Sequence, residues 1–151
     1  MTTIGFVGLG VMGAPMCRNV ARKHAGRVLA FDASPAAAEA LSGTAGEVVP
    51  ELADIWGAAD IVLLSLPGSA QVEAVCLGAD GAAQAPRKPE TIVDLSTTSV
   101  ATAKAVGQAL EAAGIAFADA PVARTREAAE KGELSIMVGA PPALFEAVAP
   151  L

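Results

Sequence analysis

A run of glycines near the start of the chain constrains the fold more than any other feature of the sequence. The motif Gly8-x-Gly10-x-x-Gly13 follows the apolar run 4–7 and opens a segment with helical periodicity. In this setting the first glycine permits a tight turn, the second lets the backbone approach a pyrophosphate, and the third lets a helix pack against a strand. The amides and dipole at the start of the helix attract the phosphates. We therefore expect a dinucleotide cradle formed by Gly8, Leu9, Gly10, Val11, Met12 and Gly13; the alternative is an ordinary glycine-rich turn between a strand and a helix.

An acidic residue, Asp32, ends the next apolar run of the chain. A carboxylate at this place can accept hydrogen bonds from the hydroxyls of an adenosine ribose, and it repels a 2′-phosphate. Ala33 and Ser34, which follow, bring no arginine that would neutralise such a phosphate. The pattern favours NAD as the cofactor, with NADP as second choice. Asp32 is equally suited to cap the N-terminus of a following helix, and the two roles are compatible.

Short β-rich runs alternate with longer alanine-rich stretches along the chain. This alternation predicts right-handed crossovers and a mostly parallel sheet covered by helices on both faces. The expected fold class is α/β, a Rossmann-type doubly wound sheet, built as one dinucleotide-binding domain over residues 1–151. We expect strands at 4–7, 27–31, 48–49, 60–66, 91–95, 115–118 and 134–138, helices at 11–23, 35–45, 51–58, 70–77, 100–113, 126–131 and from 142 onward, and loops at 78–89 and 121–125.

The composition suits such a domain and argues against several kinds of partner. The 151 residues are 53% hydrophobic, with a formal net charge of −6 and a pI near 4.7. Because no basic cluster stands out, we expect no nucleic-acid partner. The strongly apolar runs, such as 61–64, are strand-sized, so we expect no membrane partner. Cys17 and Cys76 suggest no disulfide framework, and the first residues do not resemble a signal sequence, so we expect a cytoplasmic protein.

Residue types that are absent or rare in the sequence exclude several catalytic mechanisms. The chain has no tyrosine, so the Tyr/Lys proton relay of short-chain dehydrogenases cannot be built. Its one histidine, His24, follows the first predicted helix and lies far from the expected carboxyl ends of the strands. One histidine and two cysteines cannot supply a catalytic zinc site, so we expect no metal. There is also no Gly-Lys-Ser/Thr loop of the kind that binds nucleoside triphosphates.

Four ordered motifs resemble those of the β-hydroxyacid dehydrogenases, a family that includes 3-hydroxyisobutyrate dehydrogenase, tartronate semialdehyde reductase and, more distantly, 6-phosphogluconate dehydrogenase. They extend over nearly the whole chain and are therefore a much more specific signal than the glycines alone. A further segment, 132–139, looks like the strand that follows in the family. The four motifs are Gly5-Phe6-Val7-Gly8-Leu9-Gly10-Val11-Met12-Gly13-Ala14-Pro15-Met16, Leu64-Ser65-Leu66-Pro67, Val93-Asp94-Leu95-Ser96-Thr97-Thr98-Ser99 and Asp119-Ala120-Pro121-Val122.

The resemblance implies roles for residues outside the glycine run. The Leu-Pro of the family that matches Leu66-Pro67 lines the nicotinamide-ribose side, and Gln71 falls where a cofactor contact is common. The Ser-Thr that matches Ser96 and Thr97 lies near the nicotinamide, which implies a cofactor contact for Thr97 and a substrate contact for Ser96. The alternative for Ser96 and Thr97 is to cap the helix expected at 100–113.

The chain departs from the family pattern after Pro121-Val122. The family usually has Ser-Gly-Gly there, which holds the carboxylate of the substrate, whereas this chain has Ala123, Arg124 and Thr125. We expect this segment, from Val122 to Thr125, to contact a small carboxylate substrate. We hypothesise that Arg124, with or without Arg126, replaces the lost serine by a charge-assisted contact. The alternative is that these arginines lie on a solvated loop.

The acid/base lysine of the family belongs to a Gly-x-x-Gly-x-Gly-x-x-x-Lys-x-x-x-Asn helix for which this sequence has no match before Leu151. We therefore expect no catalytic residue here, and hydride transfer to or from a small 3-hydroxy acid only in a longer parent that adds the helical C-terminal domain. A homo-oligomer is expected only with that domain. Two alternatives remain open: a nucleotide-binding module without catalysis, and an S-adenosylmethionine methyltransferase, which shares a glycine-rich first turn.

Overall fold

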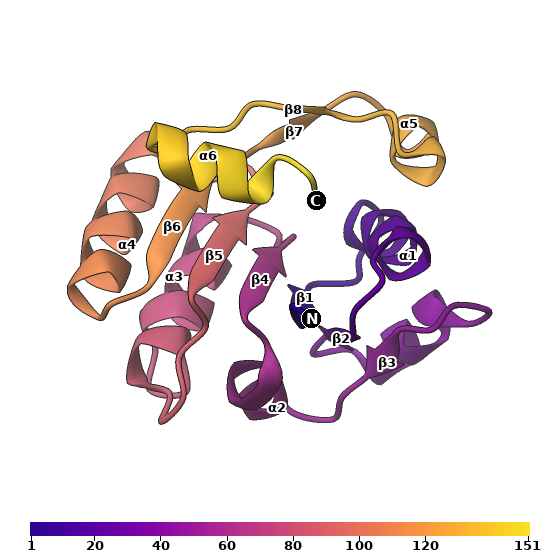
Figure 1. The fold of residues 1–151 in the computed structure, drawn as a ribbon, viewed down its shortest axis with the longest axis horizontal. Helices are drawn as coiled ribbons and strands as arrows, with labels where there is room; N and C mark the ends of the chain where they lie inside the picture. Colours follow the sequence, from indigo (N-terminus) through magenta and orange to yellow (C-terminus); the bar gives the residue numbers. More distant parts are fainter.

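Six parallel strands form the central sheet of the computed structural model, which describes residues 1–151 apart from the side chains of residues 36 and 38. The order across the sheet is β3-β2-β1-β4-β5-β6 (Figure 1). The chain therefore starts at the centre and winds outward in both directions, which is the doubly wound arrangement expected from the alternation of strands and helices. The strands are β1 (Ile4–Val7), β2 (Val28–Phe31), β3 (Glu47–Val48), β4 (Ile61–Leu64), β5 (Thr91–Asp94) and β6 (Ala116–Asp119).

Helices cover both faces of this sheet, and the alternation of side chains along each strand divides the core in two. On β1, Ile4 and Phe6 contribute to the core under α1, whereas Val7 faces the opposite core under α2, α3 and α4. Both cores are apolar and mainly aliphatic, as a sheet buried on both faces requires. The helical elements are α1 (Gly13–Lys23), the 3₁₀ helix η1 (Pro35–Leu41), α2 (Leu52–Ala58), α3 (Ser69–Leu77), the 3₁₀ helix η2 (Ala82–Gln84), α4 (Val100–Ala112), α5 (Arg126–Lys131) and α6 (Pro142–Val148).

Four segments differ from the sequence-based expectation, and one of them is the expected loop at 78–89, which contains the 3₁₀ helix η2. The helix expected at 35–45 is a 3₁₀ helix that ends at Leu41. The expected loop at 121–125 contains a two-residue strand, β7 (Val122–Ala123), and the strand expected at 134–138 shortens to β8 (Ser135–Ile136). These two strands pair antiparallel with each other and do not join the main sheet. They form a small ribbon at the top of Figure 1 that connects β6 to α5 and α6.

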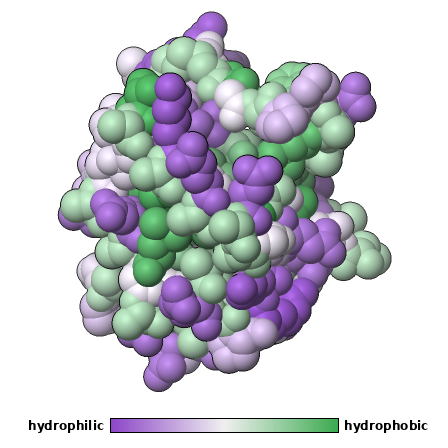
Figure 2. Space-filling model, turned by 90° about the vertical axis from the view of Figure 1, so that its left-hand side faces the viewer, coloured by the Kyte–Doolittle hydropathy of each residue, from purple (hydrophilic) through white to green (hydrophobic). Residues whose placement is uncertain are grey.

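The end of the molecule formed by α6 and the β7–β8 ribbon contains an open apolar cavity of about 340 Å³. Its lining includes Phe6 of β1, Met16 of α1, Leu95 directly after β5 and Phe145 of α6. Several strongly hydrophobic residues gather toward this upper end in Figure 2. Ile136 and Phe145 remain about half exposed, at 49% and 46%.

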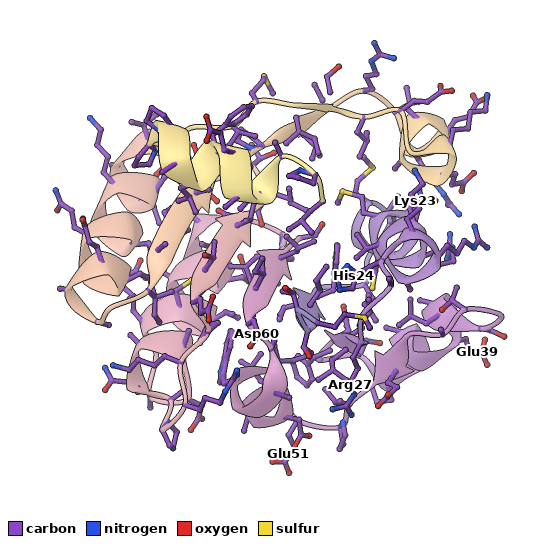
Figure 3. The ribbon with its side chains drawn as sticks, in the orientation of Figure 1. Lys23, His24, Arg27, Glu39, Glu51 and Asp60 are labelled. Atoms are coloured by element: carbon purple, nitrogen blue, oxygen red, sulfur yellow. The ribbon has the colours of Figure 1, made fainter. Side chains whose placement is uncertain are left out.

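At the opposite end of the sheet, where the strands begin, the Asp60 side chain binds a backbone amide and an arginine. Asp60 accepts a hydrogen bond from the Thr3 amide at 2.8 Å and pairs with Arg87 at 2.7 Å. The Thr3 amide and then Arg87 lower the pKa of Asp60, against the effect of its partial burial. Asp60 and Arg27 lie toward this end in Figure 3. None of the described helices is long and apolar enough to span a bilayer.

Candidate cofactor-binding site

The glycine turn between β1 and α1 has the backbone that its sequence predicts. Gly8 has a φ of +99°, a conformation that side chains rarely tolerate, and a Cβ on it would lie 2.0 Å from the Ser65 carbonyl oxygen. A Cβ on Gly13 would lie 2.0 Å from the Gly8 carbonyl oxygen. A Cβ on Gly10, by contrast, would meet nothing within 4 Å. The first and third glycines are therefore required by the protein itself, while the second leaves open space in front of the backbone.

The start of α1 offers unpaired hydrogen-bond donors to this open space. The first bonded amide beyond the turn is that of Ala14, which donates to the Gly10 carbonyl at 3.0 Å. Within the described part of the chain, no acceptor meets the amides of Val11, Met12 and Gly13. Val11 is also 66% exposed. Three free amides at the start of a helix, beside a glycine without a side chain, form a cradle that fits a pyrophosphate.

Asp32 lies beside this turn, directly after β2. One carboxylate oxygen accepts from the Leu9 amide at 2.7 Å, and the other accepts from the Ser34 amide at 2.7 Å. The expected N-cap role is wrong, because the N-cap of η1 is Ser34 and the structure records no side-chain bond from Asp32 to the amides of the helix itself. Asp32 remains partly exposed, so its remaining lone pairs face solvent at the edge of the cradle.

A second group of loops meets at the carboxyl ends of β4 and β5. Ser96, only 4% exposed, accepts a hydrogen bond from the Leu66 amide at 2.9 Å. This bond joins the loop after β5 to the Leu66-Pro67 loop after β4. Ser96 therefore orients the loop that the resemblance assigns to the nicotinamide side, and its near-complete burial restricts direct contact with a ligand.

The capping alternative for Ser96 and Thr97 is wrong, because α4 is capped by Ser99. The Ser99 hydroxyl accepts from the Thr102 amide at 3.2 Å, and the Ser99 amide donates to the Ser69 hydroxyl at 3.0 Å. Thr97 is left exposed on the loop. Gln71, in the first turn of α3, is also exposed. Both side chains are accessible at the same edge of the sheet as the glycine turn.

Asp94, which sequence reasoning did not single out as a site residue, organises the loop after β5. It is fully buried, and its two oxygens accept from the Ser96 amide at 3.0 Å and the Thr98 hydroxyl at 2.6 Å. Its backbone carbonyl accepts from the Ala120 amide at 2.8 Å. Asp94 therefore connects loops after two neighbouring strands. The sequence signal was present in the short polar run 96–99 after a buried strand.

The neighbouring strand places a second carboxyl group beside Asp94. Asp119 is its register partner on β6, and one Asp119 side-chain oxygen is buried without a hydrogen-bond partner among the described residues. Burial, and then the negative charge of Asp94, raise the pKa of Asp119. Ionisation of the Asp119 carboxyl group is therefore unfavourable at the point where residues 119–122 leave the sheet.

The segment that departs from the family pattern is exposed. Arg124 has a φ of +94° and is the one residue other than glycine with a positive φ among those described. Thr125 caps α5, since its hydroxyl accepts from the Ala128 amide at 3.3 Å. Arg126 pairs with Glu130 at 2.9 Å. Of the two arginines considered for carboxylate recognition, Arg124 is therefore the one without a carboxylate partner in the described structure.

No lysine among the described residues stands at the carboxyl ends of the strands. Lys23 ends α1, Lys104 lies within α4, and Lys131 ends α5, where it pairs with Glu127 at 2.7 Å. Lys88 precedes β5 and donates to the Ala113 carbonyl. The described side chains also form no group of three or more metal-ligating residues. What this edge of the sheet can do chemically is bind and orient an anionic, extended ligand.

The apolar cavity is not this site, since none of the residues expected to bind a cofactor lines it. A dinucleotide is long and lies along the edge of a doubly wound sheet, where strand ends and helix starts provide a shallow surface. The open cavity between α1 and α6 has the opposite character, with mainly apolar walls. The candidate site is identified by the backbone geometry and free amides of the glycine turn, and not by the volume of the cavity.

Comparison with known proteins also points to a domain that binds a dinucleotide. The model of a family described as the NAD binding domain of 6-phosphogluconate dehydrogenase matches residues 3–151. The 2-hydroxy-3-oxopropionate reductase of Escherichia coli K12 is 38% identical over 148 residues, which are 98% of this chain and 50% of that protein. Human mitochondrial 3-hydroxyisobutyrate dehydrogenase is 35% identical over 138 residues, 91% of this chain and 41% of that protein.

A solved structure agrees over nearly the whole chain. The 3-hydroxyisobutyrate dehydrogenase of Mycobacterium tuberculosis, solved with L-serine, superposes with a TM-score of 0.88 at 33% identity, covering 99% of this chain and 50% of that one. The chain spans about half the length of the relatives it matches. The family match also argues against a methyltransferase, which was considered because it shares a glycine-rich first turn and an acid at the second strand.

Proposed function

We propose that this chain, which belongs to the family of NAD-binding domains described for 6-phosphogluconate dehydrogenase, is the cofactor-binding half of an oxidoreductase acting on a small 3-hydroxy acid. The rest of the enzyme would be a helical domain in a longer parent protein. The proposal draws on relatives named as hydroxy-acid dehydrogenases and reductases, which are about twice as long. We further propose that any homo-oligomer depends on that second domain.

The observation that carries the proposal is the open face of the glycine turn. The free amides of Val11, Met12 and Gly13 and the bare Cα of Gly10 would hold the pyrophosphate, with Leu9 and Gly8 shaping the turn. Bound NAD would supply the chemistry by exchanging a hydride with the carbon that carries the substrate hydroxyl. The residues of this chain bind and orient; they move no proton.

Cofactor choice would depend on Asp32. Its partly exposed carboxylate has lone pairs left to accept the ribose hydroxyls, and its negative charge would repel a 2′-phosphate. Ala33 and Ser34 bring no positive charge to offset that repulsion. The site therefore favours NAD, and NADP is the second choice.

The nicotinamide end would lie against the loops after β4 and β5. Leu66 and Pro67 would line the ribose side, with exposed Gln71 and Thr97 within the same edge of the sheet. Ser96 would act by holding the Leu66 amide.

Substrate binding would involve the exposed segment after β6. Arg124 is exposed and without a carboxylate partner in the described structure, so a substrate carboxylate can pair with it without breaking an internal bond. Val122 and Ala123 would contribute contacts from β7, and Thr125 would keep the segment in place by capping α5. An acid/base lysine would have to come from the second domain.

Titration of this chain with NADH, followed by protein-to-nicotinamide fluorescence transfer from Trp56 or by calorimetry, tests cofactor binding. We expect NADH to bind more tightly than NADPH and S-adenosylmethionine to give no thermal shift. Tighter NADPH binding would overturn the argument from Asp32, and no NADH binding would overturn the proposed function.

The catalytic part of the proposal needs a separate test. We expect essentially no turnover of hydroxy acids with NAD by these 151 residues alone. Robust turnover would contradict the assignment of the proton-moving group to a second domain. A longer parent that binds NADH and turns over no hydroxy acid would instead favour a nucleotide-binding module without catalysis.

A further inference from the structure

We infer that Asp32 is a positioning residue for the pyrophosphate cradle, in addition to any contact that it makes with the ribose. The inference rests on the proposed function, since it assigns a second task to a residue of the proposed cofactor site. Its basis is the bond from the Leu9 amide to an Asp32 oxygen at 2.7 Å, which joins the glycine turn to the end of β2.

The turn needs such a restraint because its conformation is unusual. Gly8 has a φ of +99°, and glycine turns are entropically costly to hold in one shape. On one side the Gly8 amide donates to the Phe31 carbonyl at 2.9 Å. On the other, the Leu9 side chain is buried in the core, only 5% exposed. The Asp32 carboxylate completes the restraint at the backbone between the first two glycines.

The carboxylate itself is held in place. Its second oxygen accepts from the Ser34 amide at 2.7 Å, so both oxygens bind backbone donors from two different segments. Bonds from amides to a charged acceptor are stronger than neutral ones. With the carboxylate fixed at both ends, the Leu9 amide is oriented toward β2, and the next amides, from Val11 onward, stay free for an anion.

These two tasks do not compete. An ionised carboxylate can accept about four hydrogen bonds, and the structure uses one on each oxygen. The remaining lone pairs of the partly exposed group can accept ribose hydroxyls. Removing the side chain would therefore weaken the binding of the phosphates as well as that of the ribose.

A ligand without ribose diols separates the two tasks. 2′,3′-Dideoxyadenosine diphosphate keeps the pyrophosphate and lacks the hydroxyls that Asp32 would bind. We expect Asp32→Ala to weaken the binding of both ligands, by roughly ten- to a hundredfold, with the larger loss for NADH because it also loses the ribose contact. Asp32→Asn should have an intermediate effect because one oxygen remains. Glu111→Gln, near the far end of α4, is the control for the loss of one negative charge and should change neither affinity.

Amide exchange tests the restraint with no ligand present. We expect the Leu9 amide to exchange with solvent at least about tenfold faster in Asp32→Ala than in wild type and in Glu111→Gln, measured by NMR on folded protein. Unchanged exchange at Leu9, or weaker NADH binding with unchanged binding of the dideoxy ligand, would overturn the inference. If wild type binds neither ligand, the proposed function fails, and the exchange measurement still decides on the restraint.

Discussion

Gly13 and Gly10 of the turn should respond to the same substitution in opposite ways. In Gly13→Ala, the new Cβ would lie 2.0 Å from the Gly8 carbonyl oxygen, which is more than 1 Å inside ordinary contact and against backbone that cannot rotate away. We expect a loss of about 3 kcal/mol in the free energy of unfolding, the upper end for overpacking, or roughly 6–12 °C in Tm for a domain of this size.

Gly10→Ala should leave the fold intact and damage binding. Its Cβ would meet nothing within 4 Å, and Gly10 does not have a positive φ, so stability should stay within about 0.5 kcal/mol of wild type or rise slightly. The same Cβ would project into the space where the pyrophosphate approaches, so NADH affinity should fall roughly tenfold or more.

Urea unfolding followed by Trp56 fluorescence gives the stabilities, and NADH titration gives the affinities. Each variant is the control for the other, because both exchange glycine for alanine in the same turn. Equal destabilisation by the two substitutions, or NADH binding unchanged in Gly10→Ala, would refute the geometric reasoning about the cradle.

Three further predictions concern residues at the edge of the sheet. Because the pKa of Asp119 is raised in the folded state, its ionisation destabilises the fold as pH rises above the unfolded value near 4; Asp119→Asn should add about 1 kcal/mol at pH 7 and flatten that decline, and an unchanged pH profile of unfolding would contradict this. Ser96→Ala leaves the Leu66 amide without its acceptor and should cost about 1–3 kcal/mol, whereas exposed Thr97→Ala should cost little; equal effects would exclude the restraint. Arg124→Gly should stabilise this chain by about 1 kcal/mol by relieving the positive φ, and raise KM for the hydroxy acid in a longer parent; a loss of stability or an unchanged KM would argue against the respective role.

Much of the fold followed from local patterns. The strands of the main sheet and the helices α1 to α4 lie within a few residues of the expected ranges, because burial on both faces of a parallel sheet leaves continuous apolar runs. The ribbon of β7 and β8 was missed as a pair. Its two strands have two residues each and come together only through the turn around α5, which no periodicity reveals.

The sequence predicted correctly which residues lie together at this edge of the sheet. It was less successful in predicting the hydrogen bonds that their side chains make. The backbone geometry of the glycine turn was predicted, because a positive φ at Gly8 and close backbone contact at Gly8 and Gly13 require glycine whatever the surroundings. The alternative of helix capping by Ser96 and Thr97 named the wrong hydroxyls: Ser99 caps α4, and Ser96 accepts a hydrogen bond from the loop after β4. The four consecutive hydroxyl residues 96–99 are similar candidates for the N-cap. The position at which the chain leaves β5 and enters α4 determines which of them caps the helix.

The glycine turn therefore illustrates the division between sequence and tertiary structure. Its neighbours along the chain determined that residues 8–13 turn sharply and open a helix, since backbone sterics act over a few residues. Whether Asp32 would cap a helix or restrain that turn depended on the pairing of β1 with β2, which brings its carboxylate to within 2.7 Å of an amide 23 positions away. Contacts of this kind exist only once strand register is established, because a carboxylate accepts whichever donor the packed strands place within reach.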